Sequence, residues 1–239
     1  MIEFKKVKKY YERTIGLYEV DMQIKKGEVV GILGENGSGK STMLKVMMGL
    51  TEVTFGEVSI EEKKPSELYE RMAFITEEGS YFPNMTIGEY GEFLSVFYPK
   101  FDHERYRKLT DYFALSKLKK IKTFSKGEKS KVEIAAGFAK MADYILMDEP
   151  FLGKDMFTRK DFLKLMVSSL KEEETILIST HQLSEIENFI DRAVVLRDGT
   201  IKADFYLDDI REEGKSLPEK MMEILGYDEN RYKRVFENQ

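Results

Sequence analysis

Residues 29–42 read VVGILGENGSGKST, a run of aliphatic side chains that leads into a glycine-rich turn. The turn fits the phosphate-loop pattern G-x-x-x-x-G-K-[ST], and a helical pattern continues over residues 42–48. Such a turn can surround phosphate groups, because glycines let backbone N–H groups point inward and the helix start adds positive potential. The residues expected to bind the nucleotide are Gly34, Asn36, Gly37, Ser38, Gly39, Lys40, Ser41 and Thr42.

Two side chains of this loop have predicted roles of their own. Lys40 is expected to reach the β- and γ-phosphates, and the Ser41 hydroxyl is expected to ligate Mg²⁺. The alternative is an ordinary strand-to-helix turn that fits the pattern by chance. Such chance matches are less common when a strand precedes the pattern and a helix follows it, as here. The loop therefore predicts a site for ATP and Mg²⁺.

Short apolar runs recur on both sides of this loop, with helical patterns between them. They occupy residues 29–33, 73–75, 144–147, 175–178 and 193–196. None alternates between apolar and polar residues, which is typical of strands buried on both faces of a largely parallel sheet. The first thirty residues and residues 56–60 do alternate and predict antiparallel strands at one side, whereas residues 86–141 show helical spacing. The pattern predicts an α/β domain with a helical insertion.

Composition narrows the possible function classes. The 239 residues suit one domain, and no stretch approaches the roughly 20 apolar residues of a membrane-spanning helix. The start lacks the apolar core of a signal peptide, so the chain is expected to stay in the cytoplasm. It has no cysteine, and His103 and His181 cannot alone hold zinc. A net charge of −5 argues against nucleic acid as the main partner.

An adjacent pair of carboxylates, Asp148 and Glu149, directly follows the apolar run at residues 144–147. In an open α/β sheet the carboxyl ends of the strands form the ligand crevice, so both acids should lie near the phosphate loop. Asp148 is suited to hold Mg²⁺, and Glu149 is suited to act as a general base on the attacking water. The alternative is a polar loop at a strand end. Together with the phosphate loop, the pair predicts ATP hydrolysis.

Ser125-Lys126-Gly127-Glu128 stands upstream of this pair, with a helical pattern between them. The segment resembles the signature sequence of ATP-binding-cassette (ABC) ATPases, whose usual form is L-S-G-G-Q. The interval of 24 residues from Gly127 to Pro150 is similar to that of the family in length and order. Residues 151–155 resemble the D-loop of the family, and His181 resembles its switch histidine. The resemblance extends to about residue 204.

The resemblance implies a fold, a phosphate-loop NTPase (RecA-like) core with an antiparallel β subdomain and an α-helical insertion subdomain. One ATPase domain would then span residues 1–239. Within it, residues 86–141 would form the helical subdomain and residues 205–239 a C-terminal extension.

The resemblance also implies a head-to-tail pair of cassettes, with each ATP bound between the phosphate loop of one copy and the signature of the other. Ser125, Gly127 and Glu128 would contact the nucleotide from the second copy, together with Asp155 of the D-loop. The catalytic residues it implies are Lys40, Glu149 and His181, although a lone histidine after a strand is often structural. Tyr11 falls where the family places an adenine-stacking aromatic, but either Tyr11 or its neighbour Tyr10 could instead pack in a sheet.

Four positions depart from the pattern of the family: Glu77, Lys126, Glu128, which replaces a glutamine of the signature, and Lys154, which replaces an apolar residue of the D-loop. Glu77 stands where the family carries a Mg²⁺-binding glutamine; its carboxylate could ligate the metal but would add a third acid near the phosphates. Lys126 replaces a glycine of the signature, and its charge either reaches toward the phosphates or faces solvent. None of these changes removes a group that hydrolysis itself needs.

The function implied by the resemblance is the motor subunit of an ABC transporter, peripheral at the inner face of the membrane through a transmembrane permease. Residues 81–87 resemble the surface beside the permease, although their aromatics could equally be core. The overall pattern is similar to exporters of peptides, antimicrobial compounds or toxins. The alternatives are a soluble ATP-driven switch that acts on ribosomes or DNA, and a small-molecule kinase with a different phosphate-loop fold.

Overall fold

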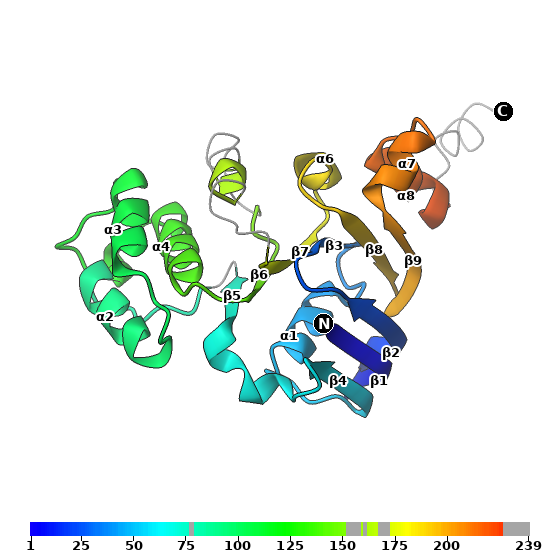
Figure 1. Cartoon of the computed structure of the whole chain (residues 1–239), viewed down its shortest axis with the longest axis horizontal. Coiled ribbons are helices and arrows are strands. Elements are labelled where there is room, and N and C mark those ends of the chain that lie inside the picture. Colours follow the sequence, from blue (N-terminus) through cyan, green and yellow to red (C-terminus); the bar gives the residue numbers. More distant parts are fainter. Residues whose placement is uncertain (77–78, 152–158, 160–161, 167–172, 227–239) are drawn as a thin grey trace.

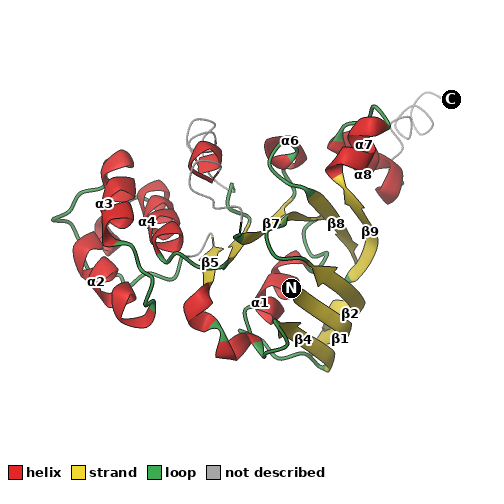
Figure 2. Cartoon of the chain, in the orientation of Figure 1, coloured by secondary structure: helices red, strands yellow, loops and turns green. Residues whose placement is uncertain are grey.

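The computed structural model of the chain describes residues 1–76, 79–151, 159, 162–166 and 173–226. Two sheets form its centre: a six-stranded sheet in the order β5-β6-β7-β3-β8-β9 and a three-stranded sheet in the order β2-β1-β4 (Figure 1). The helices lie on both sides of the larger sheet and at its ends (Figure 2). This is the α/β class expected from the apolar runs.

The larger sheet is parallel except at one edge. Its strands are β3 (Val29–Leu33), β5 (Met72–Thr76), β6 (Tyr144–Asp148), β7 (Thr175–Thr180), β8 (Arg192–Arg197) and β9 (Thr200–Tyr206). Strands β5, β6, β7, β3 and β8 pair in parallel, and β9 pairs antiparallel with β8 across the turn at Asp198 and Gly199. Strand β9 ends at Tyr206, so the first two residues of the expected C-terminal extension belong to the sheet.

Both faces of this sheet are covered along its parallel strands, which explains why those strands do not alternate in polarity. Neighbouring residues of β6 join different apolar clusters: Ile145 and Met147 pack with the helices, whereas Leu146 packs with helix α1 (Lys40–Met47) and the smaller sheet. Burial on both faces selects apolar side chains at every position of a strand.

The smaller sheet is antiparallel throughout and packs one face on α1. It consists of β1 (Ile2–Tyr11), β2 (Thr14–Ile24) and β4 (Phe55–Ile60). Ile2 pairs with Ile24 on one side and with Ile60 on the other, and all three are fully buried. The alternation predicted for these segments follows from one buried and one exposed face.

Three helices within residues 86–141 gather at one end of the molecule: α2 (Ile87–Phe97), α3 (His103–Tyr112) and α4 (Lys126–Ala139) (Figure 1). Each begins at a side-chain cap, Thr86, Asp102 and Ser125 respectively. Helix α4 packs closely on β5 at Gly137, where an added Cβ would lie 2.5 Å from Ile75 Cδ1. A larger residue than glycine there would push the helix away from the sheet.

The other helices whose bounds lie wholly within the described residues are short. They are α6 (Leu183–Ile186), α7 (Leu207–Glu212), α8 (Leu217–Leu225) and the 3₁₀ turns η1 (Pro65–Glu67), η2 (Tyr69–Arg71) and η3 (Ile121–Thr123). Helix α8 packs on α6 and α7. Within the described ranges, no helix combines the length and the apolar character that crossing a bilayer requires.

Candidate nucleotide-binding and catalytic site

The phosphate loop joins β3 to α1 as predicted, and its glycines adopt conformations that other residues avoid. Gly34, Gly37 and Gly39 have φ angles of 152°, 82° and 109°. A Cβ at Gly34 would lie 2.3 Å from the Leu196 carbonyl oxygen, and one at Gly39 would lie 2.5 Å from the Gly16 carbonyl oxygen. The loop therefore needs glycine both for its backbone angles and for its close approach to neighbouring backbone.

Lys40 is the first residue of α1, and its side chain is folded back under the loop. The ammonium donates hydrogen bonds to the carbonyl oxygens of Gly34 (2.8 Å) and Glu35 (3.1 Å), and it lies 3.4 Å from Glu149 Oε1. The side chain is only 5% exposed. A buried ammonium so close to the loop can interact strongly with an anion held there, because little water screens it.

Asp148 ends β6 and accepts hydrogen bonds from two hydroxyl groups. Ser41 Oγ lies 3.0 Å from Asp148 Oδ1, and Ser179 Oγ of the neighbouring strand β7 lies 2.5 Å from the same atom. Asp148 and Ser179 face each other in the parallel register of β6 and β7. This arrangement joins the hydroxyl of the phosphate loop to the strand-end carboxylate, the two ligand types predicted for Mg²⁺.

Glu149 follows Asp148 with φ of 46°, a left-handed conformation that costs free energy in a residue other than glycine. Its backbone N–H donates to the Ser179 carbonyl oxygen at 3.0 Å, which anchors the turn. The turn places the Glu149 carboxylate between Lys40 and His181, whose Nδ1 lies 3.0 Å from Glu149 Oε2. A carboxylate held in this way can accept a proton from a water molecule beside the phosphate loop.

His181 follows β7, and its side chain is 38% exposed. An ionised carboxylate can only accept hydrogen bonds, so the contact with Glu149 requires a hydrogen on Nδ1 and leaves Nε2 as the ring atom that faces other partners. The structure thus brings together Lys40, Ser41, Asp148, Glu149 and His181, which the sequence places in three separate segments.

The other predicted site residues lie away from this group of side chains or outside the described residues. Ser125 caps α4 in a reciprocal pair with Glu128: each backbone N–H donates to the side chain of the other residue. A Cβ at Gly127 would meet no atom within 4 Å, so the start of α4 is open to an approaching group. Glu77 and Asp155 lie outside the described residues.

The two candidate tyrosines have different surroundings. Tyr10 makes an edge contact with Phe55 at a centroid distance of 6.3 Å. Tyr11 is 43% exposed, and a Cβ added at Gly16 would lie 2.8 Å both from the Tyr11 ring and from Thr42 Cγ2. Gly16 therefore lets the Tyr11 ring lie beside the start of α1, which favours Tyr11 over Tyr10 as an adenine contact.

Ser179 was not singled out from the sequence, although it bonds Asp148 and anchors Glu149. Gly16 was missed as well. No sequence motif identifies a functional serine inside a buried strand or a functional glycine inside an antiparallel strand. For Ser179, the one weak signal was its position two residues before His181 at the end of a strand.

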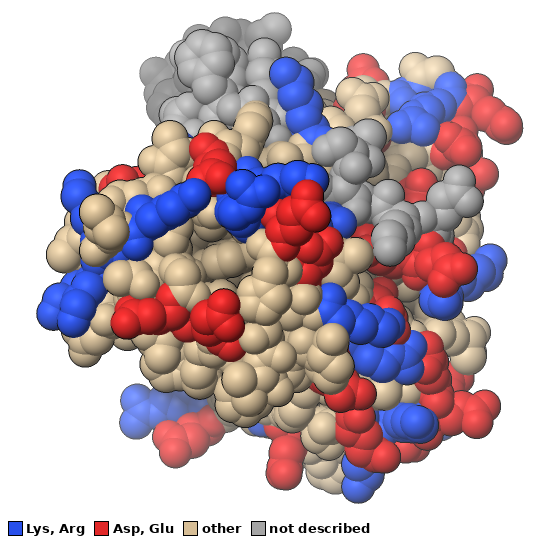
Figure 3. Space-filling view, turned by 60° about the vertical axis from the view of Figure 1, so that its left-hand side comes forward, with Lys and Arg blue, Asp and Glu red and all other residues tan. Residues whose placement is uncertain are grey.

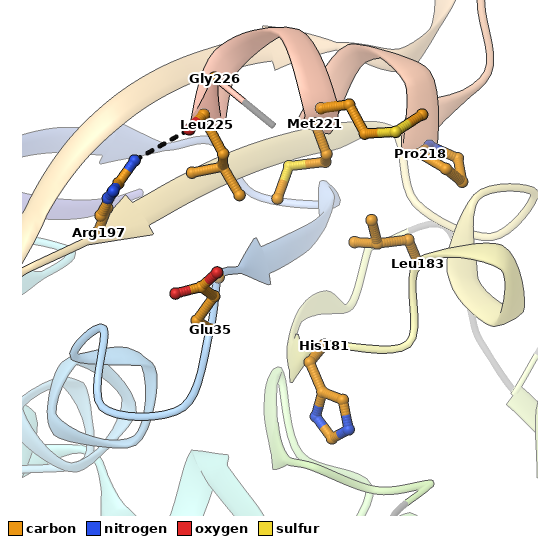
Figure 4. A pocket seen from close by; sticks show the side chains of 10 residues that line it. Glu35, His181, Leu183, Arg197, Pro218, Met221, Leu225 and Gly226 are labelled. Atoms are coloured by element: carbon orange, nitrogen blue, oxygen red, sulfur yellow. Dashed lines mark hydrogen bonds between the residues drawn. The ribbon is translucent and has the colours of Figure 1, made fainter. Parts of the chain in front are cut away.

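A cavity of about 500 Å³ adjoins the phosphate loop and the switch histidine. Figure 4 shows Glu35 and His181 on one side of it, opposite Met221 and Leu225 of α8, with Leu183 between them. Arg197 donates to the Leu225 carbonyl oxygen at 3.0 Å and so holds the end of α8 over this cavity. Helix α8 thus borders the region where a nucleotide would reach His181.

These residues fit Mg²⁺ and ATP on their own chemistry. Ser38 Oγ is buried and has no hydrogen-bond partner within the described part of the chain. This is expected of a hydroxyl that donates to a bound anion. The Ser41 hydroxyl and the Asp148 carboxylate are oxygen ligands of the kind that Mg²⁺ prefers. Mg²⁺ bound there would neutralise charge on the β- and γ-phosphates.

The fold and the site define a class, the phosphate-loop proteins that bind and hydrolyse nucleoside triphosphates. Residues 17–152 match the profile of the ABC transporter family. The chain is 32% identical over 217 residues to the ABC transporter ATP-binding protein YtrB of Bacillus subtilis, an alignment that covers 89% of this chain and 74% of YtrB. It is 28% identical to the phosphonates import ATP-binding protein PhnC of Fusobacterium nucleatum, over 89% of this chain and 97% of PhnC.

Two solved structures are similar over nearly their whole length. The ATP-binding subunit of an ABC transporter has a TM-score of 0.84 at 31% identity, over 94% of this chain and 99% of that subunit. The cassette MJ0796, solved as a dimer in a post-hydrolysis state with ADP and Pi, has a TM-score of 0.77 at 27% identity, over 87% and 99%. The chain therefore belongs to the ABC transporter family, as an ATP-binding subunit that binds Mg²⁺–ATP and hydrolyses it.

Proposed function

We propose that this chain is the motor of a transporter that exports peptides, antimicrobial compounds or toxins, and that it works as a head-to-tail dimer around two Mg²⁺–ATP. The observation that carries the motor function is the position of the Glu149 carboxylate between Lys40 and His181, beside a phosphate loop. A transport motor must couple hydrolysis to dimer closing and opening, which requires a base and a switch that act on the same phosphate.

The proposed roles of the residues follow from this geometry. Lys40 and the backbone of the phosphate loop hold the phosphates, and Ser41 and Asp148, with Glu77, hold Mg²⁺. Glu149 takes the proton of the attacking water, while His181 orients its carboxylate and contacts the γ-phosphate through Nε2. The Tyr11 ring stacks on adenine.

The start of α4 supports a site completed by a second copy. Ser125 Oγ and the N–H groups of the first turn lie at a helix N-terminus, where backbone donors favour an anion, and no atom within 4 Å would obstruct a Cβ at Gly127. We propose that Ser125, Gly127, Glu128 and Asp155 of one copy complete the nucleotide site of the other. The second cassette is an identical chain or a related subunit.

A groove beside α2 supports docking of a permease. The cavity measures about 570 Å³, and its lining includes Phe82, Phe93 and Phe97 as well as Glu67 and Glu70. Phe82 packs edge-on against Phe93 at 4.6 Å, yet Phe82 and Phe97 are 45% and 58% exposed. Figure 3 shows this end of the molecule, where uncharged surface lies among interspersed acidic and basic side chains. An exposed aromatic cluster of this kind suits an apolar protein segment.

The domain division and the location belong to the same proposal. Residues 86–141 act as a helical subdomain within one ATPase domain of residues 1–239, and residues 205–239 form a C-terminal extension. The chain lies at the cytoplasmic face of the membrane through its permease. The overall sequence pattern favours export, whereas the relative PhnC is named for import.

The test is purification of the tagged chain from its native host, once from detergent-solubilised membranes and once from a detergent-free extract. We expect a multi-span membrane protein to copurify in detergent, and we expect Mg²⁺-dependent phosphate release from ATP without any added acceptor. Copurification with ribosomes or DNA, and with no membrane protein, would favour the soluble switch instead. Vesicles of the complex loaded with labelled candidate peptides then decide the direction of transport.

A further inference from the structure

Glu133 is a buried carboxylate that the hydrolysis site does not use. It lies on α4, eight residues after Ser125, and is only 4% exposed. Burial raises its pKa, and the hydrogen bonds from Ser80 together with the charge of Lys140 oppose that rise. A carboxylate in such surroundings is costly unless its oxygens are bonded, so its partners identify what it holds.

Both oxygens of Glu133 are bonded to one residue. The Ser80 backbone N–H donates to Oε1 at 2.9 Å, and the Ser80 hydroxyl donates to Oε2 at 3.0 Å. This bidentate contact joins α4 to the segment of residues 79–82, which connects β5 toward α2. The contact spans 53 positions of the sequence and therefore links two elements rather than stabilising one.

The segment of residues 79–82 is held tightly at this point. Gly79 has φ of 75°, and its N–H donates to Thr76 Oγ1 at the end of β5. A Cβ at Gly79 would lie 2.5 Å from the Tyr81 ring and 3.5 Å from Glu133 Cγ. A shift of this segment would therefore be transmitted to the Glu133 side chain rather than absorbed locally.

Ser80 and Glu133 each connect to a surface that the proposed function uses. These surfaces are the aromatic groove beside α2 and the start of α4. Ser80 and Phe82 line the aromatic groove beside α2. Glu133 is about 12 Å along the helix axis from Ser125, at 1.5 Å per residue. Both belong to one continuous helix, a rigid element that can carry coupling between its ends. The orientation of Ser125 is thus tied to the position of the groove wall.

We propose that Glu133 is a positioning residue, which fixes α4, and Ser125 at its start, relative to the segment of residues 79–82. The inference rests on the proposed role of Ser125 in a shared nucleotide site. The Glu133–Ser80 hydrogen bonds set the angle at which Ser125 meets the second copy.

The test compares three variants of the full chain: Glu133→Ala, Glu133→Gln and Val132→Ala. The amide of glutamine can accept the Ser80 N–H and donate to the Ser80 hydroxyl, whereas alanine can do neither. Val132 is a fully buried neighbour on the same helix, and its truncation should lower stability without changing the Ser80 link. The measurements are kcat for ATP hydrolysis, Mg²⁺–ATP affinity of the monomer, and thermal unfolding.

We expect Glu133→Ala to lower kcat about two- to thirtyfold, the range for changes within a coupling network, with monomer ATP affinity unchanged. Glu133→Gln should keep kcat within about twofold of wild type, and Val132→Ala should keep kcat while lowering the unfolding temperature. The inference is wrong if Glu133→Ala retains wild-type kcat, or if Glu133→Gln or Val132→Ala loses as much kcat as Glu133→Ala. Absence of hydrolysis in the wild type would instead contradict the proposed function.

Discussion

The Glu149 carboxylate lies 3.4 Å from Lys40 Nζ and 3.0 Å from His181 Nδ1, and its left-handed backbone holds it there. The lysine places a positive charge beside one carboxylate oxygen, and the histidine hydrogen bond fixes the orientation of the other. Hydrolysis at this site depends on the position of the Glu149 carboxylate to within a few ångströms. Single substitutions can test this dependence.

Glu149→Gln should still bind ATP but hydrolyse it at least about a hundredfold more slowly, since an amide cannot take a proton from the attacking water. The measurement combines equilibrium binding of Mg²⁺–ATP with steady-state phosphate release. Glu35→Gln, which removes the same charge from an exposed acid of the phosphate loop, is the control. Near-normal turnover in Glu149→Gln would mean that the base is a different group.

Helix α4 depends on a close approach to β5. Gly137 provides it: an added Cβ would lie 2.5 Å from Ile75 Cδ1 and 2.6 Å from Ile75 Cγ1. The two atoms belong to a side chain, so a small residue could be accommodated by a change of rotamer, whereas a branched one would force the helix outward. The position of Ser125 relative to the sheet follows from this packing.

Gly137→Val should lower the free energy of unfolding by about 1–3 kcal/mol, as overpacking of a core typically does. Urea unfolding followed by circular dichroism measures it. Gly88→Ala is the matched control, because the nearest atom to its added Cβ, Thr86 Oγ1, is 4.0 Å away. It should be neutral or slightly stabilising. Equal losses in both variants would show that the α4–β5 contact is not the cause.

The two sheets are joined by an ionic cluster at one edge of the molecule. Arg71, which precedes β5, donates to both oxygens of Glu61 after β4, at 2.6 and 2.8 Å, and also bonds Asp143 before β6. The Arg71 hydrogen bonds, against the opposing effect of burial and with help from the Tyr144 hydroxyl, lower the pKa of Glu61 from 4.5 to about 2. This contact links the smaller sheet to the larger one.

Because the pKa of Glu61 is depressed in the folded chain, its contribution to stability is present above about pH 4.5 and is lost as the pH falls toward about 2. Glu61→Gln should therefore be less stable than wild type near neutral pH, with a smaller difference at pH 3. Urea unfolding between pH 3 and 7 tests this. Glu62→Gln, at an exposed neighbouring position, should leave the pH profile unchanged.

A nucleotide site shared between two copies makes a prediction about mixtures. Lys40→Ala damages the phosphate loop and Ser125→Arg damages the signature, so each variant should be inactive alone. In a mixed head-to-tail dimer both defects fall in one site, and the other site is intact. Equimolar mixing should then restore up to about a quarter of the wild-type rate, since about half of the dimers would be mixed. A mixture as inactive as its components would contradict the head-to-tail arrangement.

Local pattern alone predicted the phosphate loop, the strands of both sheets other than β9, the helical character of residues 86–141 and the order of Asp148 and Glu149. These features are visible in a sequence because each depends on a period or a spacing of a few residues: glycines at fixed positions, apolar runs with or without alternation, and polar residues at strand ends. The ABC signature became visible through its distance from the carboxylate pair.

Tertiary structure decided which distant groups meet. Ser179 bonds Asp148, Gly16 makes room for Tyr11 beside α1, and Glu133 holds Ser80 across 53 positions. None of these residues stands in a pattern of its own, because contacts between elements depend on strand order and helix packing rather than on neighbours along the chain. Strand β7 lies between β6 and β3 although it is the last of the three in sequence, and this order brings Ser179 and His181 to the site.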